Sequence, residues 1–150
     1  KLSKSRPFVV KEQAYLPAKK SVFNKIVADS HFELEFASFL EDCDDIISYA
    51  KNYFAVHFKI DYRNADGSIS DYYPDFIVKT SPKEHYIVET KGREDLDDIE
   101  KIKRLQQWCD DVNAGQKNTT FSMLYIKQED WEKHSQKPRS FREVIRGWEK

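Results

Sequence analysis

The chain has 150 residues, a length that fits one domain with a sizeable hydrophobic core. Ten Phe, eight Tyr and three Trp can fill that core, which excludes a disordered chain. No apolar run approaches the roughly 20 residues of a membrane-spanning helix, so we expect no membrane partner. The two cysteines, Cys43 and Cys109, form no CxxC pair, which argues against a disulfide scaffold or a Cys-based zinc site and predicts a cytoplasmic protein.

The net charge of −1 hides an uneven distribution along the chain. Residues 1–25 carry a net +6, residues 26–126 a net −9 and residues 127–150 a net +2. A domain that binds DNA alone is usually more basic, because phosphate neutralisation dominates affinity. We therefore expect other domains to supply much of the grip on any nucleic acid. The aperiodic start, which lacks an initiator Met, predicts a basic linker from an upstream domain over 1–20 and a folded domain over 21–150.

The first clear element is a helix after an ambiguous segment at 20–27, which has the pattern of a short helix at best. Ser30 and Glu33 form the S-x-x-E pattern of a capping box, and apolar residues at helical spacing follow. This pattern predicts a helix over 30–51.

Three strands joined by short turns follow the helix. Apolar and polar residues alternate most regularly over 53–62, and the Asn64-Ala65-Asp66-Gly67 segment is a turn signal. The pattern predicts an antiparallel meander of three strands, over 53–62, 71–79 and 85–91.

A helix, a strand and a final helix complete the predicted order. Apolar residues recur at three- and four-residue steps over 95–113, and a β-rich run covers 119–127. A second S-x-x-E pattern, Ser140 with Glu143, begins a short amphipathic helix. The predicted order is α-β-β-β-α-β-α. The chain contains no Walker A loop, dinucleotide fingerprint, nucleophile elbow or H-E-x-x-H pattern.

The candidate chemistry lies on the second and third predicted strands. Glu89 and Lys91 are two residues apart on a strand, so their side chains leave the same face. Asp75, after Pro74, adjoins an apolar run on the neighbouring strand and lies beside Glu89 if the hairpin register permits. Buried charges are costly unless they are paired or bound to metal. The alternative is a surface ion pair at a strand end with Pro-Asp as turn punctuation.

Two such carboxylates repel each other, and a Mg²⁺ between them removes the repulsion. Mg²⁺ takes about six oxygens and keeps several waters, so two carboxylates, a backbone carbonyl and a phosphate oxygen suffice. The carbonyl of Thr90, between the two motif residues Glu89 and Lys91, is a candidate ligand. The metal would acidify water and polarise a phosphate, and Lys91 could orient or deprotonate that water, or stabilise charge on the phosphate.

These residues resemble the motif of the PD-(D/E)XK nuclease superfamily, whose common core is α-β-β-β-α-β. The match is Pro74-Asp75, thirteen residues, then Glu89-Thr90-Lys91. More narrowly, the chain is similar to the C-terminal endonuclease domain of type III restriction enzyme Res subunits. The segments that carry this similarity are 22–27, 30–37, 72–76, 88–92 and Trp108-Cys109.

The resemblance implies a four-stranded mixed sheet flanked by helices and Mg²⁺-dependent cleavage of double-stranded DNA, with Mn²⁺ as a substitute. It also implies a helicase-like ATPase upstream on the same polypeptide and, for such enzymes, a modification or specificity subunit. Asp75 and Glu89 would be metal ligands and Lys91 the catalytic lysine. Glu33 fits the acid that the superfamily often adds from the first helix, with Glu35 as its substitute.

Other residues are weaker candidates. Any of Lys101, Lys103, Arg104 and Gln106 could touch backbone phosphate, although each more often belongs to a solvated helix face. Tyr72 and Tyr73 are more often sheet residues than base-stacking platforms. Two alternative functions stay open at this point: another nuclease of the superfamily, acting in repair, exonucleolysis or transposition, and a catalytically inactive module that binds DNA or protein.

Overall fold

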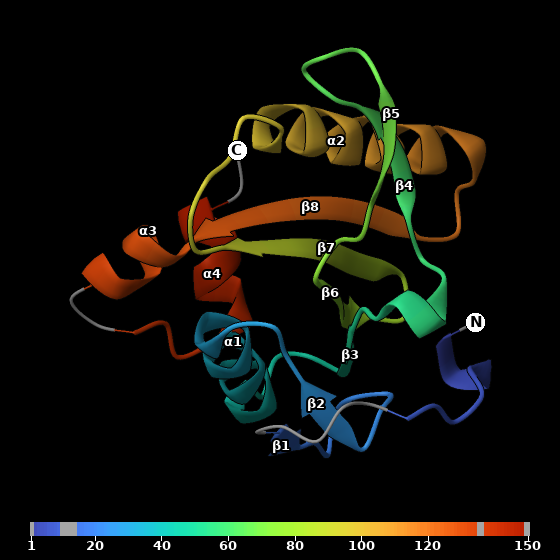
Figure 1. Cartoon of the computed structure of the whole chain (residues 1–150). Helices are drawn as coiled ribbons and strands as arrows, with labels where there is room; N and C mark the ends of the chain where they lie inside the picture. Colours follow the sequence, from blue (N-terminus) through green and yellow to red (C-terminus); the bar gives the residue numbers. More distant parts are fainter. Residues whose placement is uncertain (1, 10–14, 135–136, 149–150) are drawn as a thin grey trace.

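A computed structural model describes residues 2–9, 15–134 and 137–148 of the chain (Figure 1). The elements are, in chain order, η1 (Leu2–Lys4), β1 (Tyr15–Pro17), β2 (Lys25–Val27), α1 (His31–Asp42), β3 (Ser48–Lys51), η2 (Phe54–Val56), β4 (Ile60–Arg63), β5 (Ile69–Tyr72), β6 (Phe76–Ser81), β7 (Glu84–Lys91), α2 (Asp98–Gly115), β8 (Thr120–Lys127), α3 (Gln128–Lys133) and α4 (Phe141–Trp148).

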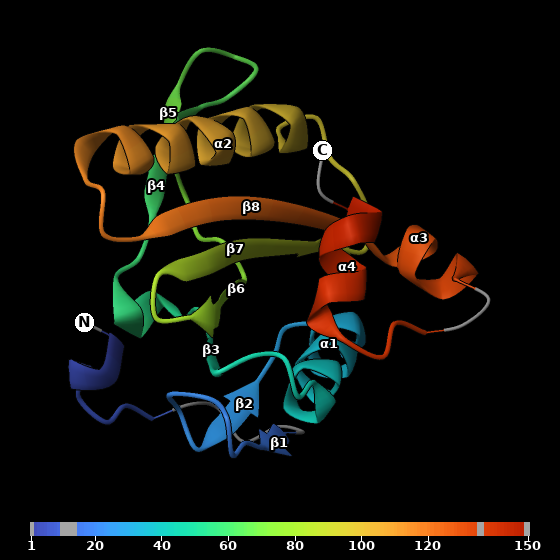
Figure 2. The ribbon, with the colours of Figure 1, turned by 180° about the vertical axis from the view of Figure 1, so that it is seen from behind.

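A four-stranded mixed sheet with the order β3-β6-β7-β8 forms the centre of the molecule. β3, β6 and β7 pair antiparallel, whereas β7 and β8 pair parallel with α2 between them in sequence. Figures 1 and 2 show α1 and α4 on one side of this sheet, and α2 with the β4–β5 hairpin on the other. The succession α1, β3, β6, β7, α2, β8 is the predicted α-β-β-β-α-β core, so the predicted fold class is confirmed.

Two hydrophobic cores lie on the two faces of the sheet. The larger one packs α1 and α4 against the sheet, and its largest side chains include Phe36, Phe76 and Trp131. The smaller one lies beneath α2, around Ile87 and Leu105. Alternate residues of β7 serve the two cores, because successive side chains of a strand point to opposite faces. The two cores therefore pack against β7 on both faces of the sheet.

The first helix forms where its capping box predicts, but it is shorter than expected. The Glu33 N–H donates to Ser30 Oγ at 3.2 Å, and the Glu33 carboxylate accepts from the Asp29 N–H at 3.1 Å. The helix ends at Asp42, not near residue 51, because Cys43 is extended and its N–H turns back to Leu40 and Phe39 carbonyls. Residues 48–51 instead form β3, which pairs with β6.

The prediction of one strand over 53–62 is wrong. Residues 54–56 form a 3-10 turn, and His57 has a left-handed φ of 59° that ends any regular extension. Only Ile60–Arg63 becomes a strand, β4, and it pairs with β5 outside the central sheet. The predicted strand over 71–79 is likewise two strands, β5 and β6, separated near Pro74, which has no N–H to donate to a ladder.

The remaining predictions agree closely with the structure. β7 and β8 lie within one residue of the predicted strands, α2 begins three residues later than predicted, and Ser140 caps α4 through the Glu143 N–H at 3.3 Å. The ambiguous segment 20–27 contains β2, which pairs with β1, and α3 was not predicted. The division into a linker over 1–20 and a domain over 21–150 stays a prediction, and residues 10–14 lie outside the described part.

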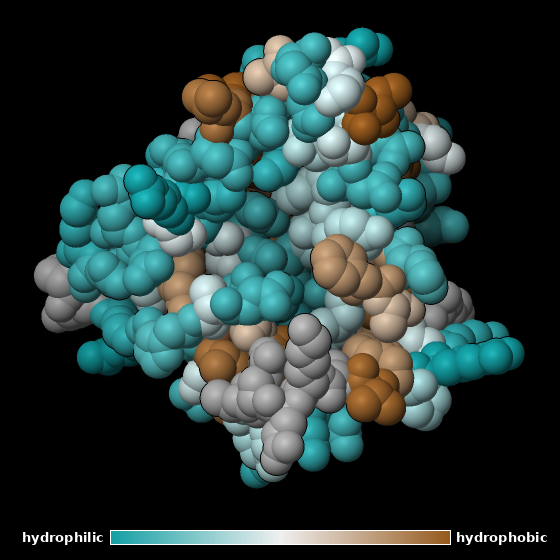
Figure 3. Space-filling view, in the orientation of Figure 1, coloured by the Kyte–Doolittle hydropathy of each residue, from teal (hydrophilic) through white to brown (hydrophobic). Residues whose placement is uncertain are grey.

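Among the described helices, none is long and apolar enough to cross a membrane. The face seen in Figure 3 is largely hydrophilic, with separate apolar patches.

Candidate active site

The ends of β3, β6 and β7 border an open cleft of about 640 Å³. Phe76 at the start of β6 lies opposite Val88 of β7. Asp75 and Glu89 are the next residues toward the same end of this antiparallel pair, so the register brings the two motif acids side by side. Both acids line the cleft. The structure therefore brings together the first two residues of the motif.

Asp75 is held by β7 on one side and by a lysine on the other. Its Oδ2 accepts from the Thr90 N–H at 2.9 Å and from Thr90 Oγ1 at 2.7 Å. Its Oδ1 lies 3.8 Å from Lys51 Nζ. Burial raises the pKa of Asp75, and the Lys51 charge and the Thr90 donors only partly oppose this effect.

Glu89 accepts a hydrogen bond from a hydroxyl and forms no ion pair among the described residues. Tyr72, which is 4% exposed, donates its hydroxyl to Glu89 Oε2 at 2.8 Å. Burial, and then the charge of Asp75, raise the pKa of Glu89 well above its ordinary value. Tyr72 is thus a buried partner of a site acid, and its ring is not free to stack on a base.

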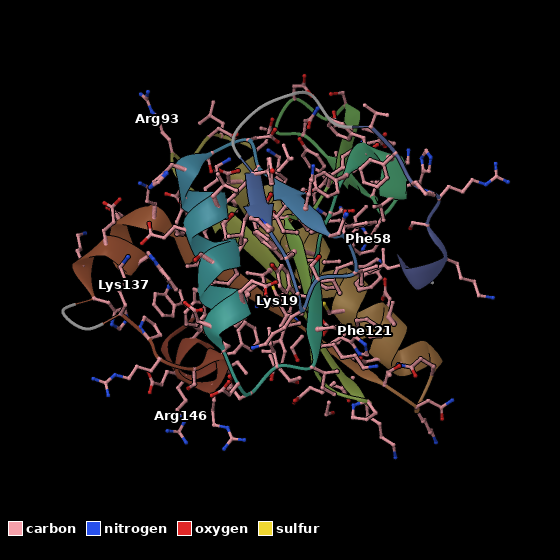
Figure 4. All side chains as sticks on the ribbon, turned by 90° about the horizontal axis from the view of Figure 1, so that it is seen from below. Lys19, Phe58, Arg93, Phe121, Lys137 and Arg146 are labelled. Carbon is pink, nitrogen blue, oxygen red and sulfur yellow. The ribbon has the colours of Figure 1, made fainter. Side chains whose placement is uncertain are left out.

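Glu33, and not Glu35, is the helix acid beside the motif. Glu33 Oε2 lies 3.6 Å from Lys51 Nζ, and burial, then the charge of Asp75, raise the pKa of Glu33. Glu35 accepts from Trp131 Nε1 at 3.4 Å and pairs with Lys137. Figure 4 shows Lys137 at the outer side of α1, near α3. Two acids only two residues apart on α1 therefore have different surroundings.

Lys91 lies at the end of β7 and is tied to the start of α2. Its Nζ lies 2.8 Å from Asp98 Oδ1 and 3.3 Å from Asp95 Oδ2. Partial burial lowers the pKa of Lys91, but the hydrogen bond and charge of Asp98 and the charge of Asp95 outweigh it, so the pKa is raised. The Lys91 ammonium is therefore firmly protonated near neutral pH.

The other candidate contacts to DNA differ in their positions. Lys101 lines the cleft and shares the acids of Lys91, with Nζ 3.6 Å from Asp95 and 3.7 Å from Asp98. Tyr73 lines the cleft and packs edge-on against the exposed ring of Phe54, with 4.6 Å between centroids. The remaining three candidates are engaged elsewhere, Lys103 with Glu100, Arg104 with the Asp61 carbonyl and Gln106 with Asp110.

Two site residues escaped the sequence analysis. Lys51 and Asn52, each 5% exposed, line the cleft at the end of β3. Asn52 Nδ2 donates to the Phe58 carbonyl at 2.9 Å, whereas its buried Oδ1 has no hydrogen-bond partner among the described residues. A signal was available, because the helical apolar stripe lapses after Leu40, but it does not reveal which residue faces the acids.

The donors around the cleft match a hard divalent cation in their chemistry. Within the described part of the chain, no group of three or more His, Cys, Asp or Glu side chains could hold a metal alone. Two carboxylates with a backbone carbonyl, completed by water and phosphate, nevertheless correspond to the way Mg²⁺ usually binds. Burial is the main cause of the raised pKa of Asp75 and of Glu89, and a cation bound beside them would favour their charged forms. The unpartnered Asn52 Oδ1 could accept a hydrogen bond from a bound water.

Comparison with known proteins agrees with this geometry. A family model described as an endonuclease domain matches residues 19–129, which include every motif residue. Neither curated proteins nor solved structures yielded a match. Because the match spans most of the chain, the chain belongs to this family of endonuclease domains and is a nuclease domain, for which DNA is the implied substrate.

Proposed function

We propose that the chain is a Mg²⁺-dependent DNA endonuclease domain that hydrolyses phosphodiester bonds, with Asp75, Glu89, Lys91 and Glu33 as its working residues. The observation that carries this proposal is the β6–β7 register, which sets Asp75 beside Glu89 at the border of an open cleft. The family match supports the reaction class, and the oxygen donors support the metal.

In this proposal Asp75, Glu89 and the Thr90 carbonyl hold the metal, and Glu33 supports them through its place beside Asp75. A bound Mg²⁺ would acidify a water and polarise a phosphate oxygen. Lys91, paired with Asp98 and Asp95, would act as a donor that orients the water or stabilises charge on the phosphate. Hydrolysis forms a bond from the water oxygen to phosphorus and breaks the bond from phosphorus to O3′; one proton of the water is balanced by the proton that O3′ takes up, so the products are a 5′-phosphate and a 3′-hydroxyl.

We further propose that the domain is the cleavage module of a larger restriction enzyme of type III character. The similarity of its motif segments to Res subunits supports this assignment, as does the charge division. With a net −9 over residues 26–126, the domain has little electrostatic grip of its own. An upstream helicase-like ATPase, together with a modification or specificity subunit, would hold the double-stranded DNA. Mn²⁺ is expected to replace Mg²⁺.

Calorimetric titration with Mg²⁺ and Mn²⁺, combined with a plasmid cleavage assay of the full-length enzyme, tests the proposal. The wild type is expected to bind metal and cleave DNA. Asp75→Asn is expected to lose both, because it removes one of two ligand charges. Glu35→Gln is the control, an acid on α1 that pairs with Lys137 away from the cleft, and it should retain both. Metal binding unchanged in Asp75→Asn would contradict the proposed ligand.

One observation favours a second candidate, a catalytically inactive module that binds DNA or protein. No described group of three ligating side chains is present, and Lys91 is already paired with two acids. This candidate predicts DNA binding without metal binding or cleavage in the assays above. The nuclease proposal instead predicts weak DNA binding by the isolated chain with a shallow salt dependence.

A further inference from the structure

Lys51 is a buried lysine that the motif does not include. It ends β3 opposite Phe76, and its side chain is 6% exposed. The Asn52 N–H donates to the Asp75 carbonyl at 2.7 Å, which fixes the end of β3 against the motif. The fold therefore places this ammonium beside the acids through the backbone itself.

The contacts of Lys51 are those of a counter-ion. Its Nζ lies 3.6 Å from Glu33 Oε2 and 3.8 Å from Asp75 Oδ1, within ion-pair range but beyond hydrogen-bond length. Its hydrogen bond among the described residues goes to the Asn52 carbonyl at 3.2 Å. The ammonium thus stands between the two acids without a short bond to either.

A buried lysine is costly unless acids compensate it, and buried acids are costly unless a cation compensates them. Here Glu33 and Asp75 come from α1 and from the start of β6, and Lys51 from β3, so three separate elements bring one ammonium between two carboxylates, and the set keeps a net negative charge. Any cation that Asp75 binds lies within a few ångströms of Lys51, because only 3.8 Å separate Asp75 Oδ1 from Lys51 Nζ. Such a cation and the lysine repel each other.

We propose that Lys51 is the built-in counter-ion of the metal-free site, which holds Glu33 and Asp75 in place and weakens the binding of a divalent metal by charge competition. The inference rests on the proposed metal-dependent function. Lys51 is accordingly a positioning residue.

Lys51→Met separates this role from a merely structural one, because the substitution keeps the apolar stem and removes the charge. Thermal unfolding without metal and calorimetric titration with Mg²⁺ and Mn²⁺ are the two measurements, each made on the full chain. The variant should unfold at a lower temperature without metal. It should also bind metal at least about tenfold more tightly, because relief of a charge repulsion a few ångströms away exceeds RT several-fold. Lys133→Met, at an exposed pair with Glu129, is the matched control and should change neither value.

Metal binding that is unchanged or weaker in Lys51→Met overturns the inference, since a structural lysine would only help to shape the site. Absence of metal binding in the wild type contradicts the proposed function itself, and the inference falls with it. If Lys51→Met does not fold, the double variant Lys51→Met/Glu33→Gln removes one of the opposing charges as well. Its affinity for metal is then compared with that of Glu33→Gln alone, and the double variant should bind metal at least about tenfold more tightly.

Discussion

Two lysines flank the motif acids, and they differ in burial and in their distance from the carboxylates that they face. Lys51, on the α1 side of the sheet, is buried and has no short bond to a carboxylate. Lys91, at the α2 side, is more exposed, yet its Nζ lies 2.8 Å from Asp98. The motif lysine is therefore anchored by acids outside the motif, whereas one acid of the motif, Asp75, has a cation from outside it.

This contrast separates two tasks that one cation cannot easily perform. A lysine that compensates the negative charge of a metal ligand lies close to the metal position, so the lysine and the metal compete for the same carboxylate. A lysine that donates to water or phosphate must stay charged and oriented throughout, and its own acids ensure both. Asp98, at the start of α2, is only 4% exposed although the exposed face of that helix is strongly polar. Its carboxylate is turned toward Lys91, with which it pairs.

Of the changes that test this contrast, removal of the Lys91 ammonium should have the largest effect on activity. Lys91→Met is expected to reduce the cleavage rate of the full-length enzyme by at least about 100-fold, as loss of a charge-stabilising donor usually does. Metal binding should persist, because Asp75 and Glu89 remain. Single-turnover cleavage and calorimetry measure the two quantities.

Lys101→Met is the matched control for this variant. Lys101 contacts the same two acids at longer distances and lines the cleft, so its removal should weaken DNA binding more than the cleavage step. Equal losses of single-turnover rate in the two variants would mean that Lys91 has no distinct role, and the contrast between the flanking lysines would disappear.

A smaller effect is expected at the acid that has no adjacent lysine. Tyr72→Phe removes the hydroxyl that donates to Glu89 at 2.8 Å, and it should lower the free energy of unfolding by about 1–2 kcal/mol, because Glu89 then loses a buried partner. Chemical denaturation without metal measures this change. Tyr62→Phe removes a hydroxyl from another buried tyrosine, one that has no hydrogen bond within the described ranges, and it should cost less. Equal losses would show that the Tyr72 bond adds nothing.

Of the residues in this contrast, the motif residues could be predicted from the sequence and Lys51 could not. Asp75, Glu89 and Lys91 could be predicted because two of them share the parity of a single strand, and that strand contains the apolar run Tyr86-Ile87-Val88 between turns. Lys51 could not be predicted, because its place depends on the pairing of β3 with β6 across an intervening hairpin. Residues 48–51 carry no periodicity of their own that separates a short strand from a helix end.

Local pattern misled most where tertiary contacts override it. Residues 54–62 alternate like a strand, yet Phe54 is 75% exposed and the chain turns at His57. Only the later part of that alternation, at Ile60 and Tyr62, points into the smaller core. The number of strands in the central sheet was thus predictable, but the first of them was misplaced, and with it the lysine that faces the acids.

The ion pair of Lys137 with Glu35 lies at the surface and serves as a reference for the stabilising effect of the pairs made by Lys51 and Lys91. The hydrogen bond from Lys137, with that from Trp131, holds the pKa of Glu35 below its ordinary value. A lowered pKa means that the unfolded chain binds more protons, so this stabilisation is present above the unfolded pKa of about 4.3 and is lost as the pH falls through the folded value. Lys137→Ala should therefore cost about 0.2–1 kcal/mol at pH 7, discounted for solvent screening, and almost nothing near pH 3. Unfolding curves of both proteins across this range measure the difference. A cost that does not change with pH would mean that Lys137 acts by packing, and the pair would then be no reference for Lys51 and Lys91.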